Sequence, residues 1–248
     1  MDQTPLLRPA WKKVFQNAWV LAVVLFVVLG IVRVYGLSGP LPARQLVLVS
    51  FAVMWFLPFI FLTPEGRERI GVRRAANPLW YPGAAVLGAL GGMAVFAFGC
   101  ILFGKSGDHW YVSILASWGM DGSLASLPKY LPFLLYTVPA ILFSPVGEEL
   151  FFRGMIHESV NESWGETAAA WISGLAFAGI HLFHHGLSFD ASGIHLRLLS
   201  GLLWFGCMTA LSRLFSECRR RSGSIGPSIV AHASFNLAMN ATIFLFLV

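Results

Sequence analysis

Apolar residues dominate the chain in long runs that are separated by short polar segments. A helix that crosses the hydrocarbon core of a bilayer needs about 20 predominantly apolar residues. The runs that meet this requirement predict seven membrane-spanning helices, at about 14–35, 45–63, 82–104, 130–157, 167–185, 196–215 and 226–248. No internal repeat or low-complexity tract divides them. The pattern therefore predicts an all-α, polytopic transmembrane bundle of about seven spans, or eight if one forms two, in a single domain over residues 1–248.

Two parts of the pattern are irregular. The fourth segment contains Pro132, Pro139 and Pro145, which predict a kink, a break or a re-entrant junction because proline cannot donate to the helical ladder. Such prolines are tolerated at membrane depth when neighbouring helices satisfy the freed carbonyl groups. The segment 105–129 is too polar to span, and we expect an interfacial loop with a short amphipathic helix there.

The composition supports a membrane protein over a soluble one. Hydrophobic residues make up 56% of the chain and charged residues only 12%, whereas a soluble domain has about 25% charged residues. The net charge of +5 is therefore interpreted as an orientation signal, and no nucleic-acid partner is expected. The three cysteines, Cys100, Cys207 and Cys218, are too widely spaced to indicate a disulfide framework or a paired metal site.

The distribution of basic residues predicts the orientation. The N-terminal apolar run is too long for a signal peptide and lacks a cleavage site, so we expect a retained first helix. Lysine and arginine gather in the leader, in the loop 64–78 and in the loop 216–225. With seven spans these three regions lie on one side, which the positive-inside rule makes cytoplasmic. We therefore expect an integral protein of the cytoplasmic (plasma) membrane, with its N-terminus inside and its C-terminus outside.

Three charges interrupt the apolar stretch Ser144–Gly154, "SPVGEELFFRG". A charge at bilayer depth costs about 2.5–3.5 kcal/mol even on insertion scales, so these side chains should face a protein interior or a wet cavity. On a helix, Glu149 and Arg153 are spaced i,i+4 and can pair, whereas Glu148 lies about 100° away and is less committed. The alternative interpretation is an ion pair and a helix cap at the mouth of a span, facing headgroups.

A histidine occupies the fifth segment. His181 follows Phe177 by four residues, so the two share one helix face. His181 and His185 have a spacing that can hold a metal, but no glutamate lies between them as in the H-E-x-x-H motif. His184 and His185 are near the helix end, where we expect an interfacial position. For His181 alone, a hydrogen bond in the core is as good an explanation as a functional role.

The last segment carries a polar stripe. Ser228, His232, Asn236 and Asn240 recur every four residues on one face of an apolar helix. Interhelical hydrogen bonding, worth about 0.6 kcal/mol per bond in membranes, explains Ser228 and Asn240 well. It explains a histidine and an asparagine one turn apart less well. Together with the carboxylates, these groups suggest hydrolysis of a carbonyl compound within the membrane.

Three ordered motifs on three predicted spans carry a family resemblance. The stretches "EELFFR", "FAGIH" and "HASFN" match the patterns E-E-x-x-x-R, F-x-x-x-H and H-x-x-x-N. Over about residues 130–240 the chain thereby resembles the CPBP family, the CAAX-protease and bacteriocin-processing (Abi) group of intramembrane endopeptidases. The resemblance implies a cytoplasm-facing cavity in which a membrane-associated protein or peptide is cut near its C-terminus or processing site. By position, Glu148 would activate water with His181 as its partner, and His232 and Asn236 would stabilise the oxyanion.

The same resemblance leaves the role of metal open. Glu149 and Arg153 would support the site, and the family has been described both as metalloproteases and as metal-independent glutamate proteases. Glu148, His181 and His232 could hold Zn²⁺, or they could share a water without metal. We slightly favour the metal-free mechanism, with Zn²⁺ held by these three residues as the alternative.

Two alternatives and one geometric difficulty accompany this prediction. The protein could be a non-catalytic immunity or scaffold protein, or, with less support, a proton-coupled transporter. In addition, the predicted boundaries put His181 about 20 Å from the cytoplasmic end of its helix and His232 only about 9 Å from the end of its own. The two can meet only if the helices are tilted or displaced along their axes.

Overall fold

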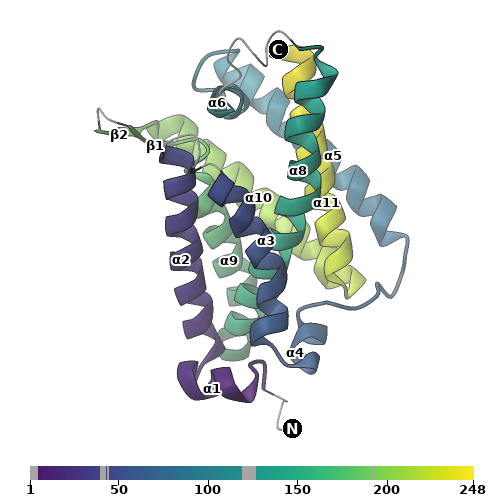
Figure 1. Ribbon diagram of the computed structural model, residues 1–248. Coiled ribbons are helices and arrows are strands. Elements are labelled where there is room, and N and C mark those ends of the chain that lie inside the picture. The colour runs from purple at the N-terminus through teal and green to yellow at the C-terminus, as the bar shows by residue number, and fades with distance from the viewer. Residues whose placement is uncertain (1–4, 40–42, 44, 119–126, 191–192) are drawn as a thin grey trace.

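The computed structural model describes residues 5–39, 43, 45–118, 127–190 and 193–248. The helices in this part of the chain are α1 (Pro9–Phe15), α2 (Ala18–Ser38), α3 (Gln45–Phe61), α4 (Pro64–Arg69), α5 (Trp80–Phe103), α6 (Trp110–Ser117), α8 (Tyr130–Glu148), the π-helix η2 (Glu149–Ile156), α9 (His157–His181), α10 (Leu198–Ser222) and α11 (Ile225–Phe246). Figure 1 shows them as a bundle with the N-terminus at one end and the C-terminus at the other. An antiparallel hairpin of β1 (Leu187–Asp190) and β2 (Gly193–Leu196), which the hydrophobic pattern does not predict, joins α9 to α10.

The helical membrane bundle is confirmed, but the predicted number of spans is not. Within the described residues, five helical segments are long and apolar enough to cross a membrane: Ala18–Ser38, Trp80–Phe103, Tyr130–His181, Leu198–Ser222 and Ile225–Phe246. The predicted span 45–63 corresponds to α3, which is apolar but has only 17 residues. The predicted span 130–157 and most of the predicted span 167–185 fall within Tyr130–His181, a helical run of 52 residues.

This long run is a helical hairpin. At about 1.5 Å per residue it would be about 78 Å long if straight, far more than the hydrocarbon core of about 30 Å. The backbone leaves the helical region at Gly165, with φ 78° and ψ 170°, a conformation that is essentially restricted to glycine. Residues at equal distances from this turn then lie side by side. Phe152 and Phe177 show this, because their ring centroids are 5.4 Å apart.

A second hairpin joins α10 and α11. It turns at Gly223, whose φ of 68° is in the left-handed region that glycine adopts most easily. The rings of Phe215 on α10 and His232 on α11 consequently stack at 5.0 Å. The turn at Gly165 is some seven residues, about 10 Å, farther from His181 than the turn at Gly223 is from His232. Figure 1 shows that α11 begins higher in the molecule than the lower end of α9, which removes the difficulty over the depths of His181 and His232.

The prolines do not break the fourth predicted span. α8 continues through Pro139 and Pro145 and passes directly into the π-helix η2. A π-helix is a wider turn with i→i+5 hydrogen bonds, and such turns occur often at functional sites. Here it begins at Glu149, so the charged motif lies where the backbone widens.

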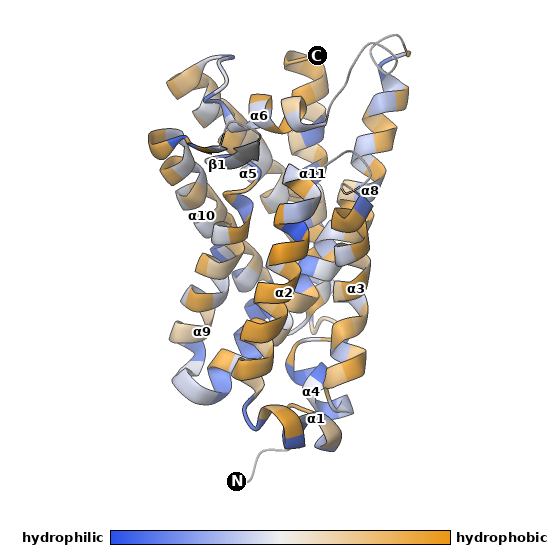
Figure 2. Cartoon of the chain, turned by 60° about the vertical axis from the view of Figure 1, so that its left-hand side comes forward, coloured by the Kyte–Doolittle hydropathy of each residue, from blue (hydrophilic) through white to orange (hydrophobic). Residues whose placement is uncertain are grey.

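Apolar surface faces outward along the length of the bundle. Figure 2 shows hydrophobic residues covering most of α2 and α3, with hydrophilic residues concentrated at the end where α4 lies. On α2, Val23, Val27 and Ile31 are each at least half exposed. Such faces suit contact with acyl chains, because lipid tails are as apolar as these side chains. Together with the five apolar segments, this identifies an integral membrane protein.

Candidate active site

Three of the predicted site residues meet at one carboxylate oxygen. Glu148, at the end of α8, is fully buried, and its Oε2 lies 3.6 Å from Nε2 of His232 and 4.0 Å from Nε2 of His181. Ser144, one turn earlier on α8, donates its hydroxyl to the same oxygen at 3.4 Å. The two hairpins explain this arrangement. Glu148 and His181 lie 17 and 16 residues on either side of Gly165, and the second hairpin carries His232 to the same depth.

The hydrogen bonds of His181 fix the role of each ring nitrogen. Nδ1 is 2.7 Å from the carbonyl oxygen of Phe177, which can only accept, so Nδ1 carries a proton. In the neutral ring Nε2 is then an acceptor, and this is the nitrogen that faces Glu148. Trp204 donates its indole N–H to the carbonyl oxygen of His181 at 2.9 Å and thereby anchors the end of α9.

Glu149 holds His232 from the other side. Its Oε1 lies 2.9 Å from Nδ1 of His232, and its Oε2 accepts the hydroxyl of Ser228. The predicted pair with Arg153 is present, at 3.2 Å between Nη1 and Oε1. A buried carboxylate that bonds one imidazole nitrogen orients the ring and fixes which nitrogen faces the other way. Glu149 is therefore the residue that aims His232 at Glu148.

Arg153 is held mainly by charge and aromatic rings. It is fully buried, and its side-chain nitrogens make no hydrogen bond within the described part of the chain. Its guanidinium carbon lies 4.0 Å from the centroid of Phe177 and 5.2 Å from that of Phe215. A desolvated cation over an aromatic face gains about 2 kcal/mol. Arg153 thus links the motif helix to the α9 and α10 faces of the site.

Glu148, expected to be the less committed of the two carboxylates, has a cation of its own. Arg33, on α2, pairs through Nη1 with Oε1 of Glu148. Its Nη2 lies 2.8 Å from Nε2 of His184, and the side chain is 3% exposed. Sequence reasoning missed Arg33 because spacing rules find only partners on the same helix. The signal was nevertheless present, since Arg33 is a single cation in the otherwise apolar segment 14–35, and such a charge needs a partner.

The polar stripe of α11 faces α8 and η2. Besides Ser228 and His232, Asn236 donates its amide to the carbonyl oxygen of Ala140 at 2.8 Å, and Asn240 donates to Oγ1 of Thr137 at 3.1 Å. The stripe therefore both joins helices and supplies site residues. The structure places Asn236 one turn from His232, with an N–H committed to the backbone of α8.

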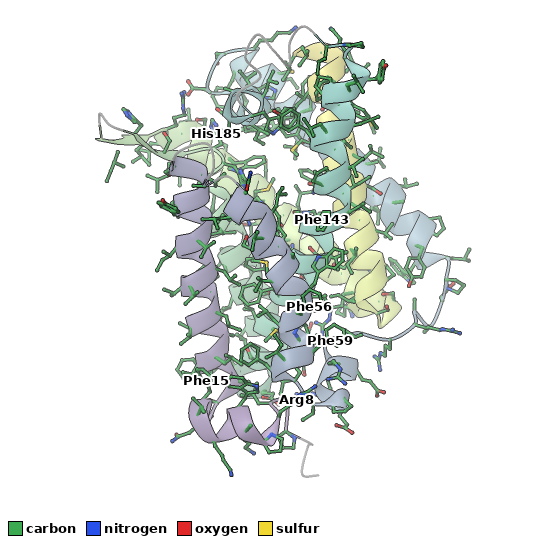
Figure 3. The ribbon with its side chains drawn as sticks, viewed as in Figure 1. Arg8, Phe15, Phe56, Phe59, Phe143 and His185 are labelled. Carbon is green, nitrogen blue, oxygen red and sulfur yellow. The ribbon has the colours of Figure 1, made fainter. Side chains whose placement is uncertain are left out.

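His184 and His185, which were expected near the membrane interface, make contacts inside the bundle. His184 contacts Arg33, while His185 is 3% exposed and bridges Ser113 at 2.8 Å and Ser200 at 2.9 Å. Figure 3 shows His185 near the end of the bundle that carries the β-hairpin. His185 therefore belongs to a separate network that joins α6 to α10.

A resident metal ion needs several nitrogen, sulfur or oxygen ligands that converge on one point. Within the described residues, no group of three or more His, Cys, Asp or Glu side chains is arranged to hold a metal ion. The guanidinium of Arg33 already balances the charge of Glu148, which weakens the attraction of this carboxylate for a cation. The donor set around Glu148 thus fits a resident Zn²⁺ poorly.

Fold and site together define an integral membrane protein whose interior holds a carboxylate facing two imidazoles, the groups that general-base hydrolysis uses. Residues 130–238 match the family described as "Type II CAAX prenyl endopeptidase Rce1-like". This match confirms the resemblance that the three motifs indicate, and the family implies a peptidase. No curated protein and no solved structure matches the chain.

Proposed function

We propose that the protein is an intramembrane endopeptidase of the CPBP type, which hydrolyses a peptide bond near the C-terminus or processing site of a membrane-associated protein or peptide. One observation carries the proposal: Nε2 of His181 and Nε2 of His232 both face Oε2 of the buried Glu148. A scaffold has no chemical need for this convergence. Family membership of the motif region supports the same activity.

The nucleophile is a water held between Glu148 and His181. Both facing atoms, Oε2 and Nε2, accept hydrogen bonds and lie 4.0 Å apart, so they need a donor between them. A water about 2.8 Å from each atom would be bonded to both at an angle of about 90°, near the angle between its own O–H bonds. As this water attacks the carbonyl carbon, its proton passes to Glu148.

The negatively charged oxygen of the tetrahedral intermediate, the oxyanion, forms next to His232 and Asn236. Glu149 holds Nδ1 of His232 and leaves Nε2 on this side, from which the imidazole, as an imidazolium, would donate an N–H to the developing charge. Asn236 has a second amide hydrogen besides the one given to Ala140. The tetrahedral intermediate then collapses, the C–N bond breaks, and Glu148 returns its proton to the leaving amine. No step of this sequence uses a metal.

An apolar groove beside the site supports a lipid-modified substrate. It has a volume of about 560 Å³ and lies between α2 and the end of α9, lined by residues that include Phe26, Gly30, Val34, Ile180 and Phe183. Its lining does not include Glu148, His181 or His232, but Ile180 directly precedes His181, so a chain in the groove would lie along the helix that carries this histidine. We propose that it takes the prenyl chain of a C-terminally prenylated peptide, the substrate class named in the family's description.

The basic segments support a cytoplasmic site entrance with the N-terminus inside. Arg8 donates its backbone N–H to the carbonyl oxygen of Phe61 at 2.9 Å, directly before α4. Arg73 donates through Nε to the carbonyl oxygen of Gly223 at 2.7 Å. The leader, the α4 region and the turn at Gly223 therefore meet at one end of the bundle, as the positive-inside rule requires. We propose that this end faces the cytoplasm of the cell that carries the protein in its plasma membrane.

Cleavage by purified protein in proteoliposomes tests the proposal. A fluorogenic peptide ending in a prenylated cysteine and three further residues should be cut, and the same peptide without its prenyl group should be cut much more slowly. The variant His181→Ala serves as the blank for contaminating proteases. Cleavage should persist in EDTA and 1,10-phenanthroline. An equal rate for wild type and His181→Ala would contradict the assignment, and loss of activity restored by Zn²⁺ would contradict the metal-free mechanism.

A further inference from the structure

Arg33 occupies a position that needs an explanation. It lies inside α2, a helix of 21 residues whose other side chains are almost all apolar, and it is 3% exposed. An arginine at such a depth costs at least about 2.5–3.5 kcal/mol on insertion scales, unless a partner compensates it. The contacts of its guanidinium identify these partners.

The guanidinium is held at two points. Nη1 pairs with Oε1 of Glu148 on α8, and Nη2 donates to Nε2 of His184 at 2.8 Å, just beyond α9. Because the guanidinium is planar, contacts to α8 and to the turn that follows α9 fix its rotation as well as its position. The ring of Phe51 on α3, 5.1 Å from the guanidinium carbon, covers it further.

Because of this pairing, the two carboxylate oxygens of Glu148 have different partners. Oε1 of Glu148 is committed to Arg33, and Oε2 remains turned toward His181 and His232. Glu149 has its own cation in Arg153, so the centre contains two carboxylates and two guanidiniums. Without Arg33, Glu148 would be a buried charge with no guanidinium, and it would take up a proton or rotate.

We infer that Arg33 is a positioning residue of the reaction: it keeps Glu148 ionised and presents Oε2, rather than Oε1, to the water and the two imidazoles. His184 acts through Arg33 by fixing the guanidinium. The inference rests on the proposed peptidase function for its kinetic consequences, but the state of Glu148 can be measured independently of cleavage.

The test compares Arg33→Gln and Arg33→Lys with Arg213→Gln, a matched loss of an arginine in a spanning helix, where Arg213 lies 5.3 Å from the ring of Trp171. Arg33→Gln should lower kcat by about 100-fold, the scale of a misplaced catalytic group, with KM changed less than about threefold. Arg33→Lys should recover at least about tenfold of this loss, because it restores a cation. Arg213→Gln should keep wild-type kinetics.

Labelling with dicyclohexylcarbodiimide supplies the second readout, because this apolar reagent attacks protonated carboxyl groups. Mass spectrometry should find Glu148 modified several-fold faster in Arg33→Gln than in wild type or Arg213→Gln. If Arg33 had a purely structural role, Arg33→Gln would lower kcat only in proportion to the folded fraction, and Glu148 would be labelled at the wild-type rate. Either of these results would overturn the inference. If Arg33→Gln does not fold, His184→Ala carries the same comparison, because it releases the guanidinium from its second contact. Wild-type kcat and wild-type labelling in His184→Ala would then overturn the inference. Failure of wild type to cut any peptide would contradict the proposed function and leave the labelling result valid.

Discussion

Glu148 and Glu149 are neighbours in the chain, yet each has its own guanidinium, Arg33 and Arg153 respectively. Removing one partner of a buried ion pair costs about 3–5 kcal/mol, because the other charge is left uncompensated. Removing both partners is often nearly neutral. Every substitution at this centre must therefore be judged by the charge that it leaves behind, as well as by its effect on cleavage.

At this scale we predict that Glu149→Gln acts mainly through stability. The variant keeps the shape of the side chain but leaves Arg153 unbalanced and weakens the hold on His232, so the free energy of unfolding should fall by about 3–5 kcal/mol. Cleavage by the folded fraction should fall less than in variants of Glu148. Thermal unfolding in detergent and kcat measure the two effects.

Two comparisons sharpen this prediction. Ser228→Ala removes only one hydrogen bond to the charged Glu149 and should cost about 1.5–3 kcal/mol, less than Glu149→Gln. The double variant Glu149→Gln/Arg153→Met removes both charges and should recover most of the lost stability. Full stability of Glu149→Gln with complete loss of cleavage would instead make Glu149 the base.

At the scale of the helices, α11 packs very closely against α5. A Cβ atom added to Gly88 would lie 1.9 Å from the backbone oxygen of Ala231, and one added to Gly92 would lie 2.9 Å from that of Phe235. Small residues at this spacing let two helices approach closely within a membrane. Because Ala231 directly precedes His232, the contact sets the position of the imidazole against Glu148.

We predict that Gly88→Ala pushes α11 away and lowers both stability and kcat. Overpacking of this kind costs about 1–3 kcal/mol, and a displaced His232 would slow cleavage further. The matched control is Gly83→Ala on the same helix, where a Cβ meets nothing within 4 Å. Equal unfolding temperatures and equal kcat for the two variants would show that this contact does not position His232.

For the whole molecule, the sequence predicted what depends on periodicity and local spacing. The apolar runs located the helices, and the motifs located Glu148, His181 and His232, which the structure brings together. The gap between the predicted spans 130–157 and 167–185 contains Gly165, where the chain turns. The predicted number of spans is not confirmed, because α3 has only 17 residues and Tyr130–His181 forms one helical run of 52 residues. The partner of Glu148 could not be predicted, because Arg33 is 115 residues away and only the packing of α2 against α8 joins them.

The topology of the whole chain gives a further prediction. If the end that carries α1, α4 and the turn at Gly223 is cytoplasmic, an epitope tag before Met1 lies inside the cell and one after Val248 lies outside. In sealed inside-out vesicles, an added protease should remove the N-terminal tag and spare the C-terminal tag. Right-side-out vesicles provide the control and should give the reverse result. Digestion of both tags in inside-out vesicles would place both termini on one side.

The central claim is that Oε2 of Glu148 takes the proton of the attacking water, and the Glu148→Gln variant tests it most directly. Because this variant leaves Arg33 unbalanced, Glu148→Gln/Arg33→Gln should be measured beside it as the charge-matched form. In proteoliposomes with folded protein confirmed by thermal unfolding, we predict that both variants cut the prenylated peptide at least about 10³-fold more slowly than wild type. Cleavage by folded Glu148→Gln at the wild-type rate would contradict the account.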